Sequence, residues 1–286
     1  MPDIDRREFL TRFGIGTAGI VAAGSVLSLA SCSSPTKKEA AKLAALRVSS
    51  DIYKTDLVQR FAFSIFDRNS QVASEGSIPI MLTSPSGKKQ KFGNVHVREK
   101  GISGNGIYSV MAILNEAGSW TMNTEFRGQQ LELSFSVTEN NIAPGLGTIC
   151  PNGITPTTSA PLDATILCTR FKGDCGLHSH SVPELLETKK PFIVIFATPA
   201  RCQTTYCGPV LELTRNVADK HTSIPVIHVE IYKDETSNNL LDAVNAWGLQ
   251  TEPWLFGITE DGKIDSRLDG AFDQSEVEEV FGRLKG

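Results

Sequence analysis

The residues of this chain best suited to chemistry are its six cysteines. Cys202 and Cys207 are separated by four residues, and Cys207 starts the run Cys207-Gly208-Pro209 ahead of a helical pattern of apolar residues. A cysteine at a helix N-terminus faces free backbone N–H groups and the positive end of the helix dipole, which stabilise its thiolate. The sequence therefore predicts a reactive thiol at Cys207, with Cys202 near enough in the chain to bridge to it.

Either cysteine of this pair can be the one that attacks a substrate, with the other as the resolving residue. Cys207 can attack while Cys202 resolves, and we expect this order because Cys207 stands at the start of the helix. The reverse order is also open, since Arg201 precedes Cys202 and a neighbouring cation favours a thiolate. A purely structural disulfide, with no exchange chemistry, is the third interpretation.

A second group of cysteines and histidines precedes this pair. Cys168 and Cys175 are followed by His178 and His180. Such residues can ligate zinc, but the paired C-x2-C hook of many zinc sites is missing, and we expect a Cys168–Cys175 disulfide instead. The sequence therefore predicts neither a metal nor another cofactor. Cys150 is left over, free or paired elsewhere.

Strand and helix patterns alternate in the part of the chain that must position these residues. The segments are 191–197, 207–217, 224–231 and 238–247. The first is a continuous apolar run, typical of a strand buried on both faces, and the third is predicted to be a second buried strand. The second and fourth have helical spacing. A hairpin over residues 253–268 follows. Ser275 and Glu278 then form the pattern of a capping box that opens a last helix.

This order of elements resembles the thioredoxin superfamily, and two short motifs add to the resemblance. Tyr206-Cys207-Gly208-Pro209 matches the first part of the family's W-C-G-P-C motif. Thr251-Glu252-Pro253 stands where the family has its cis-proline. The resemblance implies an α/β thioredoxin-like domain over residues 166–286, with a cis Glu252–Pro253 bond and with Cys207, Cys202 and Pro253 as catalytic residues.

The chain departs from the thioredoxin pattern at two positions. Val210 occupies the place of the family's second cysteine, so redox pairing must use Cys202 on the other side of Cys207. Phe196 falls where alignment from Cys202 puts the family's buried aspartate. Glu230 is a candidate substitute in proton transfer, although we favour for it a strand-end position that faces water.

The function implied by the resemblance is thiol–disulfide exchange with envelope proteins that carry thiols or disulfides. Two alternatives also come from resemblances. Thr204 and Cys207 resemble the T-x-x-C of peroxiredoxins, which implies a thiol peroxidase. Copper-delivering proteins of thioredoxin fold use C-x3-C and a distant histidine, for which His228 is the candidate. A binding protein with a structural disulfide is the non-catalytic alternative.

The preceding region shows the period-two alternation of an all-β domain. Residues 47–140 contain several short alternating runs separated by turn signals, which favours a β-sandwich and faintly resembles immunoglobulin-like envelope domains. This region has no cysteine and a single histidine, His96, so we expect a spacer or docking role. Residues 141–165 are rich in proline and glycine and are predicted to be a linker.

The first residues have the layout of an export signal. Residues 1–31 contain Arg6-Arg7 and then an uncharged apolar stretch, and they resemble a twin-arginine signal peptide. Leu29-Ala30-Ser31-Cys32 resembles a lipobox, which implies lipidation of Cys32 and a tether over residues 32–46. We therefore expect an exported lipoprotein on the outer face of a membrane, where disulfides persist. The net charge of -4 gives no sign of a nucleic-acid partner.

Overall fold

The computed structural model describes residues 43–67, 76–102, 106–202 and 205–285. The predicted signal and lipidation residues, Arg6, Arg7 and Cys32, lie outside these ranges. Strands predominate in the described part, which contains three sheets and only four helices. None of the described helices combines the length and the apolar character needed to cross a membrane.

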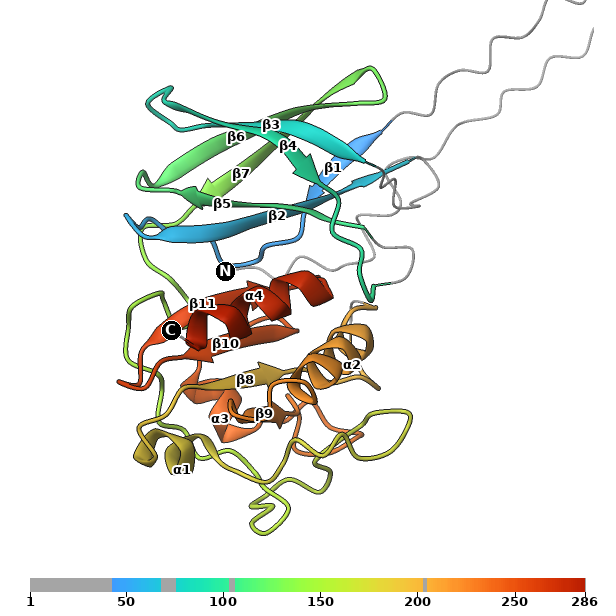
Figure 1. Ribbon diagram of the computed structural model, residues 1–286, viewed down its shortest axis with the longest axis vertical. Coiled ribbons are helices and arrows are strands. Elements are labelled where there is room, and N and C mark those ends of the chain that lie inside the picture. Colours follow the sequence, from blue (N-terminus) through green and yellow to red (C-terminus); the bar gives the residue numbers. More distant parts are fainter. Residues whose placement is uncertain (1–42, 68–75, 103–105, 203–204, 286) are drawn as a thin grey trace, which may run out of the picture. The chain divides into compact units, whose positions relative to one another are not determined.

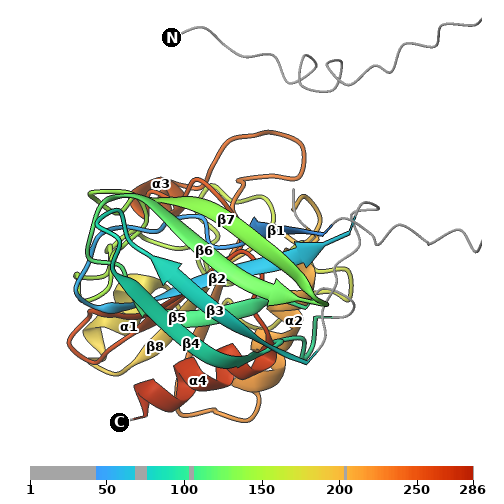
Figure 2. The ribbon, with the colours of Figure 1, turned by 90° about the horizontal axis from the view of Figure 1, so that it is seen from above.

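Two of the sheets form a β-sandwich from residue 44 to residue 137. Their strand orders are β1-β2-β5 and β4-β3-β6-β7, and all pairs are antiparallel. The strands are β1 (Ala44–Arg47), β2 (Val58–Phe66), β3 (Ser77–Thr83), β4 (Lys89–His96), β5 (Tyr108–Ile113), β6 (Gly118–Phe126) and β7 (Gln129–Val137). Figure 1 shows the two sheets stacked, and Figure 2 looks down on the four-stranded sheet lying over β2 and β5.

The sandwich core follows from the alternation of side chains along its strands. On β6, Trp120 and Met122 point inward and are buried, while Thr121 between them is partly exposed. Phe61 of β2 and Phe135 of β7 meet across the two sheets with ring centroids 4.3 Å apart. A single apolar cluster therefore joins both sheets.

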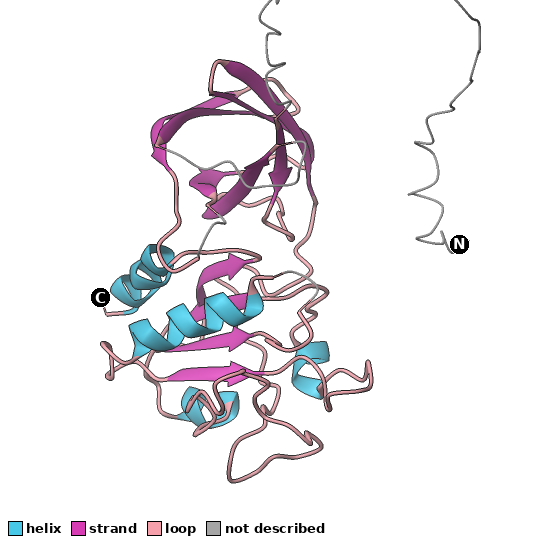
Figure 3. Cartoon of the chain, turned by 90° about the vertical axis from the view of Figure 1, so that its right-hand side faces the viewer, coloured by secondary structure: helices cyan, strands magenta, loops and turns pink. Residues whose placement is uncertain are grey.

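The third sheet lies in the C-terminal part of the chain and has the order β11-β10-β8-β9. β8 and β9 are parallel, and β10 is antiparallel to both β8 and β11. The elements are α1 (Val182–Glu187), β8 (Phe192–Phe196), α2 (Cys207–Ala218), β9 (Val226–Val229), α3 (Asp242–Ala246), β10 (Trp254–Ile258), β11 (Ile264–Asp269) and α4 (Gln274–Leu284). Figure 3 shows α2 and α4 on one side of this sheet.

Both faces of the third sheet are covered, which explains the continuous apolar run of β8. Ile193 and Ile195 belong to an apolar cluster with buried residues of α2 and α4. Val194 and Phe196 point the other way, into a cluster with residues of α1 and α3. A strand that is buried on both faces needs apolar residues at every position.

A buried ion pair joins the sandwich to the C-terminal sheet. Arg60 of β2 donates from Nε to Oε1 of Glu276 at 2.7 Å, and from Nη2 to the other carboxylate oxygen at 3.1 Å. Ser109 of β5 donates to the same Glu276 at 2.8 Å. Arg60 also donates to the main-chain oxygens of Asp269 and Ala271. Residues 41–286 form one compact unit, in which α4 lies against β2 and β5 (Figure 1).

The segment predicted as a linker, residues 141–165, contains neither a helix nor a strand. It is nevertheless held to both parts of the compact unit. The Leu146 N–H donates to the hydroxyl of Tyr53 at 2.6 Å, and the Cys150 N–H donates to the main-chain oxygen of Gly262 at 2.8 Å. These two hydrogen bonds thus hold in place a segment whose composition predicted a linker.

The last helix begins two residues earlier than its sequence pattern predicted. Asp273, and not Ser275, is the N-cap residue, with extended φ and ψ of −97° and 172°. Its carboxylate accepts the Glu276 N–H at 3.0 Å, and Glu276 accepts the Asp273 N–H at 3.2 Å. The capping box is therefore Asp273–Glu276, because the chain is still extended at Asp273 and already helical at Ser275.

Candidate functional site

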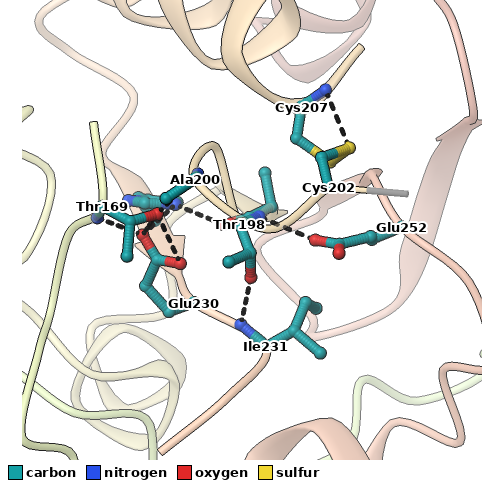
Figure 4. Close-up of a disulfide and its surroundings, with 10 residues drawn as sticks. Thr169, Thr198, Ala200, Cys202, Cys207, Glu230, Ile231 and Glu252 are labelled. Atoms are coloured by element: carbon teal, nitrogen blue, oxygen red, sulfur yellow. Dashed lines mark hydrogen bonds and ion pairs between the residues drawn. A yellow bond between two sulfur atoms is a disulfide. The ribbon is translucent and has the colours of Figure 1, made fainter. Parts of the chain in front are cut away.

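The structure brings Cys202 and Cys207 together in a disulfide, with Cα atoms 5.9 Å apart. Cys207 is the first residue of α2 and is 0% exposed. Cys202 lies in the loop before α2 and is half-buried. The Cys207 N–H donates to Sγ of Cys202 at 3.3 Å (Figure 4). The amide at the helix N-terminus is thus directed at the sulfur of Cys202, whereas the sequence had assigned the stabilising effect to Cys207.

The start of α2 explains why this amide is available. Within the described part of the chain, the N-cap residue Tyr206 makes no capping hydrogen bond with its side chain. The first amides of a helix need partners from outside the helix. Sγ of Cys202 supplies one of these partners, for the amide of the first helical residue, Cys207.

Glu252 completes the group around the disulfide. One of its carboxylate oxygens and the sulfurs of Cys202 and Cys207 all lie within 4.8 Å of one another. Burial raises the pKa of Glu252 to about 7, against the opposing effect of the Thr198 N–H, which donates to the carboxylate at 2.7 Å. A carboxyl group with a pKa near neutrality can both accept and donate a proton under physiological conditions.

Sequence analysis did not identify Glu252 as a site residue, although it lies next to Pro253 in the Thr251-Glu252-Pro253 motif. The Glu252–Pro253 peptide bond is cis, so that prediction is confirmed. Pro253 is buried and directly precedes β10. A signal for Glu252 was present in the sequence: an acidic residue stood beside the expected cis-proline.

Glu230, the substitute considered for proton transfer, has a different environment from the one expected. It is 2% exposed, so the favoured strand-end position facing water is wrong. Its carboxylate accepts the N–H of Thr169 at 2.6 Å and the hydroxyl of the same residue at 3.0 Å. The Thr169 hydroxyl oxygen in turn accepts the Ala200 N–H at 3.1 Å (Figure 4). Glu230 therefore anchors the backbone that leads toward Cys202.

The disulfide predicted between Cys168 and Cys175 is not formed, and both are free cysteines in the described chain. The sulfur of Cys175 instead lies 3.3 Å from Nε2 of His178 and 3.4 Å from Nδ1 of His228. The Cys168 sulfur belongs to the same group, in which all four ligand atoms lie within 4.8 Å of one another. His180 is exposed and lies outside this cluster.

The position of His228 also bears on the copper-carrier alternative. That alternative expects His228 beside Cys202 and Cys207, but its ring lies with Cys168, Cys175 and His178. Thr204, the residue that carries the peroxiredoxin resemblance, lies outside the described residues.

Cys150 is separate from both groups. Its thiol is buried, and burial raises its pKa to about 12. A thiol with so high a pKa has almost no thiolate at neutral pH and is a poor nucleophile.

Comparisons with known proteins match parts of this chain to solved structures. No family model and no curated protein matches the chain. Among solved structures, a crystal structure of the Lin-41 filamin domain is 15% identical and covers 34% of this chain and 93% of its own, with a TM-score of 0.23. A conjugative transposon lipoprotein from Bacteroides eggerthii is 12% identical and covers 33% of this chain and 95% of its own, with a TM-score of 0.19.

Proposed function

We propose that this chain is an exported thiol–disulfide oxidoreductase, in which a thioredoxin-like domain over residues 166–286 exchanges disulfides through Cys202 and Cys207. One observation carries the proposal. The Cys202–Cys207 disulfide lies at the N-terminus of α2, and the sulfur of the half-buried Cys202 accepts a helix amide.

The arrangement of elements supports the thioredoxin-like assignment. α2 directly follows β8, the parallel strand β9 comes next, and the β10–β11 hairpin and α4 end the chain. This is the order that the resemblance implies. The loop from β8 to α2 delivers Cys202, and the segment before β10 delivers Glu252 and Pro253.

Burial supports roles for the two cysteines that are opposite to those that the sequence favoured. A sulfur that attacks a protein disulfide must be reached by that disulfide, and Cys207 is fully buried. Cys202 is partly exposed, and the Cys207 amide that it accepts stabilises a thiolate at Cys202. Cys202 is thus the attacking residue, and Cys207 is the resolving residue.

In the reducing direction, the Cys202 thiolate attacks one sulfur of a target disulfide. A mixed disulfide forms, and the other target sulfur leaves as a thiolate. The Cys207 thiol then gives its proton to Glu252 and attacks the Cys202 sulfur. This step closes the Cys202–Cys207 disulfide and releases the second target thiolate. Two electrons pass to the target, and an external dithiol must restore the protein; the same steps in reverse oxidise a dithiol.

The location and partners of the protein are part of the same proposal. The Arg6-Arg7 signal and lipidation at Cys32 would place the domain on the outer face of a membrane. Its partners there would be envelope proteins that carry thiols or disulfides. When the full-length Cys32→Ala variant is expressed in cells, the mature chain should no longer be found in the membrane fraction. Its retention in that fraction would contradict lipidation at Cys32.

The roles of the cysteines are tested with oxidised glutathione and peptide mapping by mass spectrometry. In the reduced Cys207→Ser variant, we expect a stable glutathione adduct on Cys202, because the resolving thiol is missing. The Cys202→Ser variant should give no adduct on the buried Cys207. Cys150→Ser is the matched control and should behave as the unmodified protein does.

Two results would contradict this assignment in different ways. Adducts on Cys207 alone would exchange the two roles. The absence of adducts in both variants, together with a disulfide that dithiol reductants leave intact in the folded protein, would show that the bridge is structural.

A further inference from the structure

Four side chains outside the redox site form a compact group: Cys168, Cys175, His178 and His228. Three of the six distances between their ligand atoms are known closely. The Cys175 sulfur lies 3.3 Å from Nε2 of His178 and 3.4 Å from Nδ1 of His228, and the two nitrogens are 3.4 Å apart. All four ligand atoms lie within 4.8 Å of one another.

These distances match the edges of a tetrahedron around a zinc ion. Zinc binds cysteine sulfur at about 2.3 Å and histidine nitrogen at about 2.0–2.1 Å. For tetrahedral angles, such bonds put neighbouring ligand atoms about 3.3 to 3.8 Å apart. The three observed separations fall within this range, with the nitrogen–nitrogen and sulfur–nitrogen edges near their expected lengths.

Charge and burial also favour a metal. Cys175, His178 and His228 are 5%, 1% and 0% exposed, and Cys168 is half-buried. Burial of ionised groups is costly unless the charges are compensated. Two thiolates and two neutral imidazoles around a divalent cation give a site with no net charge, which a buried position tolerates.

A hydrogen bond outside the tetrahedron orients one of the ligands. Nε2 of His228 lies 2.9 Å from the main-chain oxygen of Ala197, so Nε2 carries the proton. Nδ1, the atom that faces Cys175 and His178, is then free to bind a cation. Metal-binding histidines commonly donate a hydrogen bond from their second ring nitrogen to a carbonyl or carboxylate oxygen in this way.

From these observations we propose that Cys168, Cys175, His178 and His228 bind one zinc ion. Four protein ligands leave no open position, which is the arrangement of structural zinc sites, and a sulfur-and-nitrogen tetrahedron favours zinc over harder cations. Three ligands come from an irregular segment, and the fourth comes from β9. The ion ties that segment to the third sheet.

The ion also lies beside the backbone that leads to Cys202. Thr169 follows the ligand Cys168 directly, and its hydroxyl oxygen accepts the Ala200 N–H two residues before Cys202 (Figure 4). Metal binding therefore holds Thr169 where it can fix the loop before α2. The zinc site itself does not depend on the proposed exchange chemistry.

The first test is the metal content of the full mature chain, purified without chelators. We expect about one zinc per chain, and near zero in the Cys168→Ser and His178→Ala variants. His180→Ala and Cys150→Ser are the matched controls, because each removes the same type of residue from outside the cluster, and both should keep the zinc. A Cys202→Ser/Cys207→Ser variant should also keep it, which separates this proposal from the redox one.

A second measurement covers the case in which the ligand variants do not fold. Cobalt(II) added to the chelator-treated, reduced protein should give the intense visible bands and the sulfur-to-cobalt charge transfer of a tetrahedral thiolate site. Bound zinc should protect Cys168 and Cys175 of the unmodified chain from alkylation, and chelation should remove that protection.

Three outcomes would overturn the proposal. The folded chain could take up neither zinc nor cobalt at equimolar concentration. Peptide mapping of the folded, metal-free protein could recover a Cys168–Cys175 disulfide in place of two thiols. The His178→Ala variant could fold and retain the full zinc content.

Discussion

At the scale of single residues, the carboxyl of Glu252 connects the environment of the disulfide to proton transfer. Its neighbours include two sulfurs and the Thr198 amide, and burial raises its pKa to about 7. In the proposed mechanism, the Cys207 thiol loses a proton before it attacks, and Glu252 would be the base in this resolving step. Glu252 would then have the role for which Glu230 was the candidate from the sequence.

The first prediction concerns the pH dependence of exchange. In a single-turnover reaction with oxidised glutathione, closure of the Cys202–Cys207 disulfide should become faster as the pH rises through about 7 and Glu252 ionises. Glu252→Gln should remove this inflection and slow closure by about 100-fold or more, the usual contribution of a general base. The exposed Glu260→Gln variant is the control. An unchanged pH profile in Glu252→Gln would exclude Glu252 as the base.

The second prediction concerns stability. Because the pKa of Glu252 is raised from 4.5 to about 7 in the folded protein, the folded state binds this proton more tightly than the unfolded state does. The contribution to the free energy of unfolding is fully present below pH 4.5 and is lost as the pH rises through about 7. Urea titrations should show that Glu252→Gln flattens the decrease between these values, and an unaltered slope would contradict the assignment.

At the scale of elements, the N-termini of α2 and α4 differ in how their backbone amides are hydrogen-bonded. The N-terminus of α2 lacks a capping side chain in the described chain and offers an amide to Cys202. The N-terminus of α4 is closed by the reciprocal hydrogen bonds of Asp273 and Glu276. The N-terminus of α2 thus donates a hydrogen bond to a sulfur outside the helix, while the N-terminus of α4 is capped by its own residues.

The third prediction distinguishes the observed cap of α4 from the one suggested by the sequence. Asp273→Ala removes the acceptor of the Glu276 N–H and should lower the free energy of unfolding by about 1 kcal/mol, within the usual range of about 0.5 to 2 kcal/mol. Ser275→Ala should change it by less than about 0.5 kcal/mol. Equal losses in both variants, measured by urea unfolding, would contradict a cap at Asp273.

At the scale of the whole compact unit, the sandwich and the C-terminal sheet share a buried charge pair. Burial would by itself raise the pKa of Glu276, but the guanidinium of Arg60 reverses the effect, and the net pKa is lowered. Arg60 is on β2, while Glu276 is on α4, so the pair couples parts of the chain that are far apart in sequence. The sandwich is therefore fixed to the sheet that carries the disulfide.

The fourth prediction follows from this coupling. Arg60→Met leaves the Glu276 carboxylate buried without its main partner, which should cost about 3 to 5 kcal/mol in unfolding free energy. The Arg60→Met/Glu276→Met double variant should recover much of this loss, since no charge is then left buried. Lys54→Met removes an exposed pair with Glu139 and should change the unfolding free energy far less than Arg60→Met does, because solvent screens this pair. A double variant as unstable as Arg60→Met would contradict the explanation.

The sequence by itself determined the local elements of this protein. The continuous apolar run 191–197 predicted β8 to within one residue at each end, because it suits a strand that is covered on both faces. The predicted strand 224–231 contains β9 and extends two residues beyond it at each end. The predicted helix start at Cys207 coincides with the start of α2. A helix was predicted over residues 238–247, but α3 covers only Asp242–Ala246. Apolar spacing does not mark where a short helix begins and ends.

Only the tertiary structure decided which side chains meet. The His228 N–H donates to the main-chain oxygen of Leu177 at 2.9 Å, and this contact brings His228 to Cys175, 53 residues earlier in the chain. The packing of α2 buries Cys207 and leaves Cys202 accessible, which spacing between the two could not reveal. Glu252 reaches the sulfurs because the segment before β10 lies beside the N-terminus of α2. Sequence periodicity shows which face of its own helix or strand a residue occupies. Which residues of other elements lie opposite that face depends on how the strands and helices are arranged in the fold.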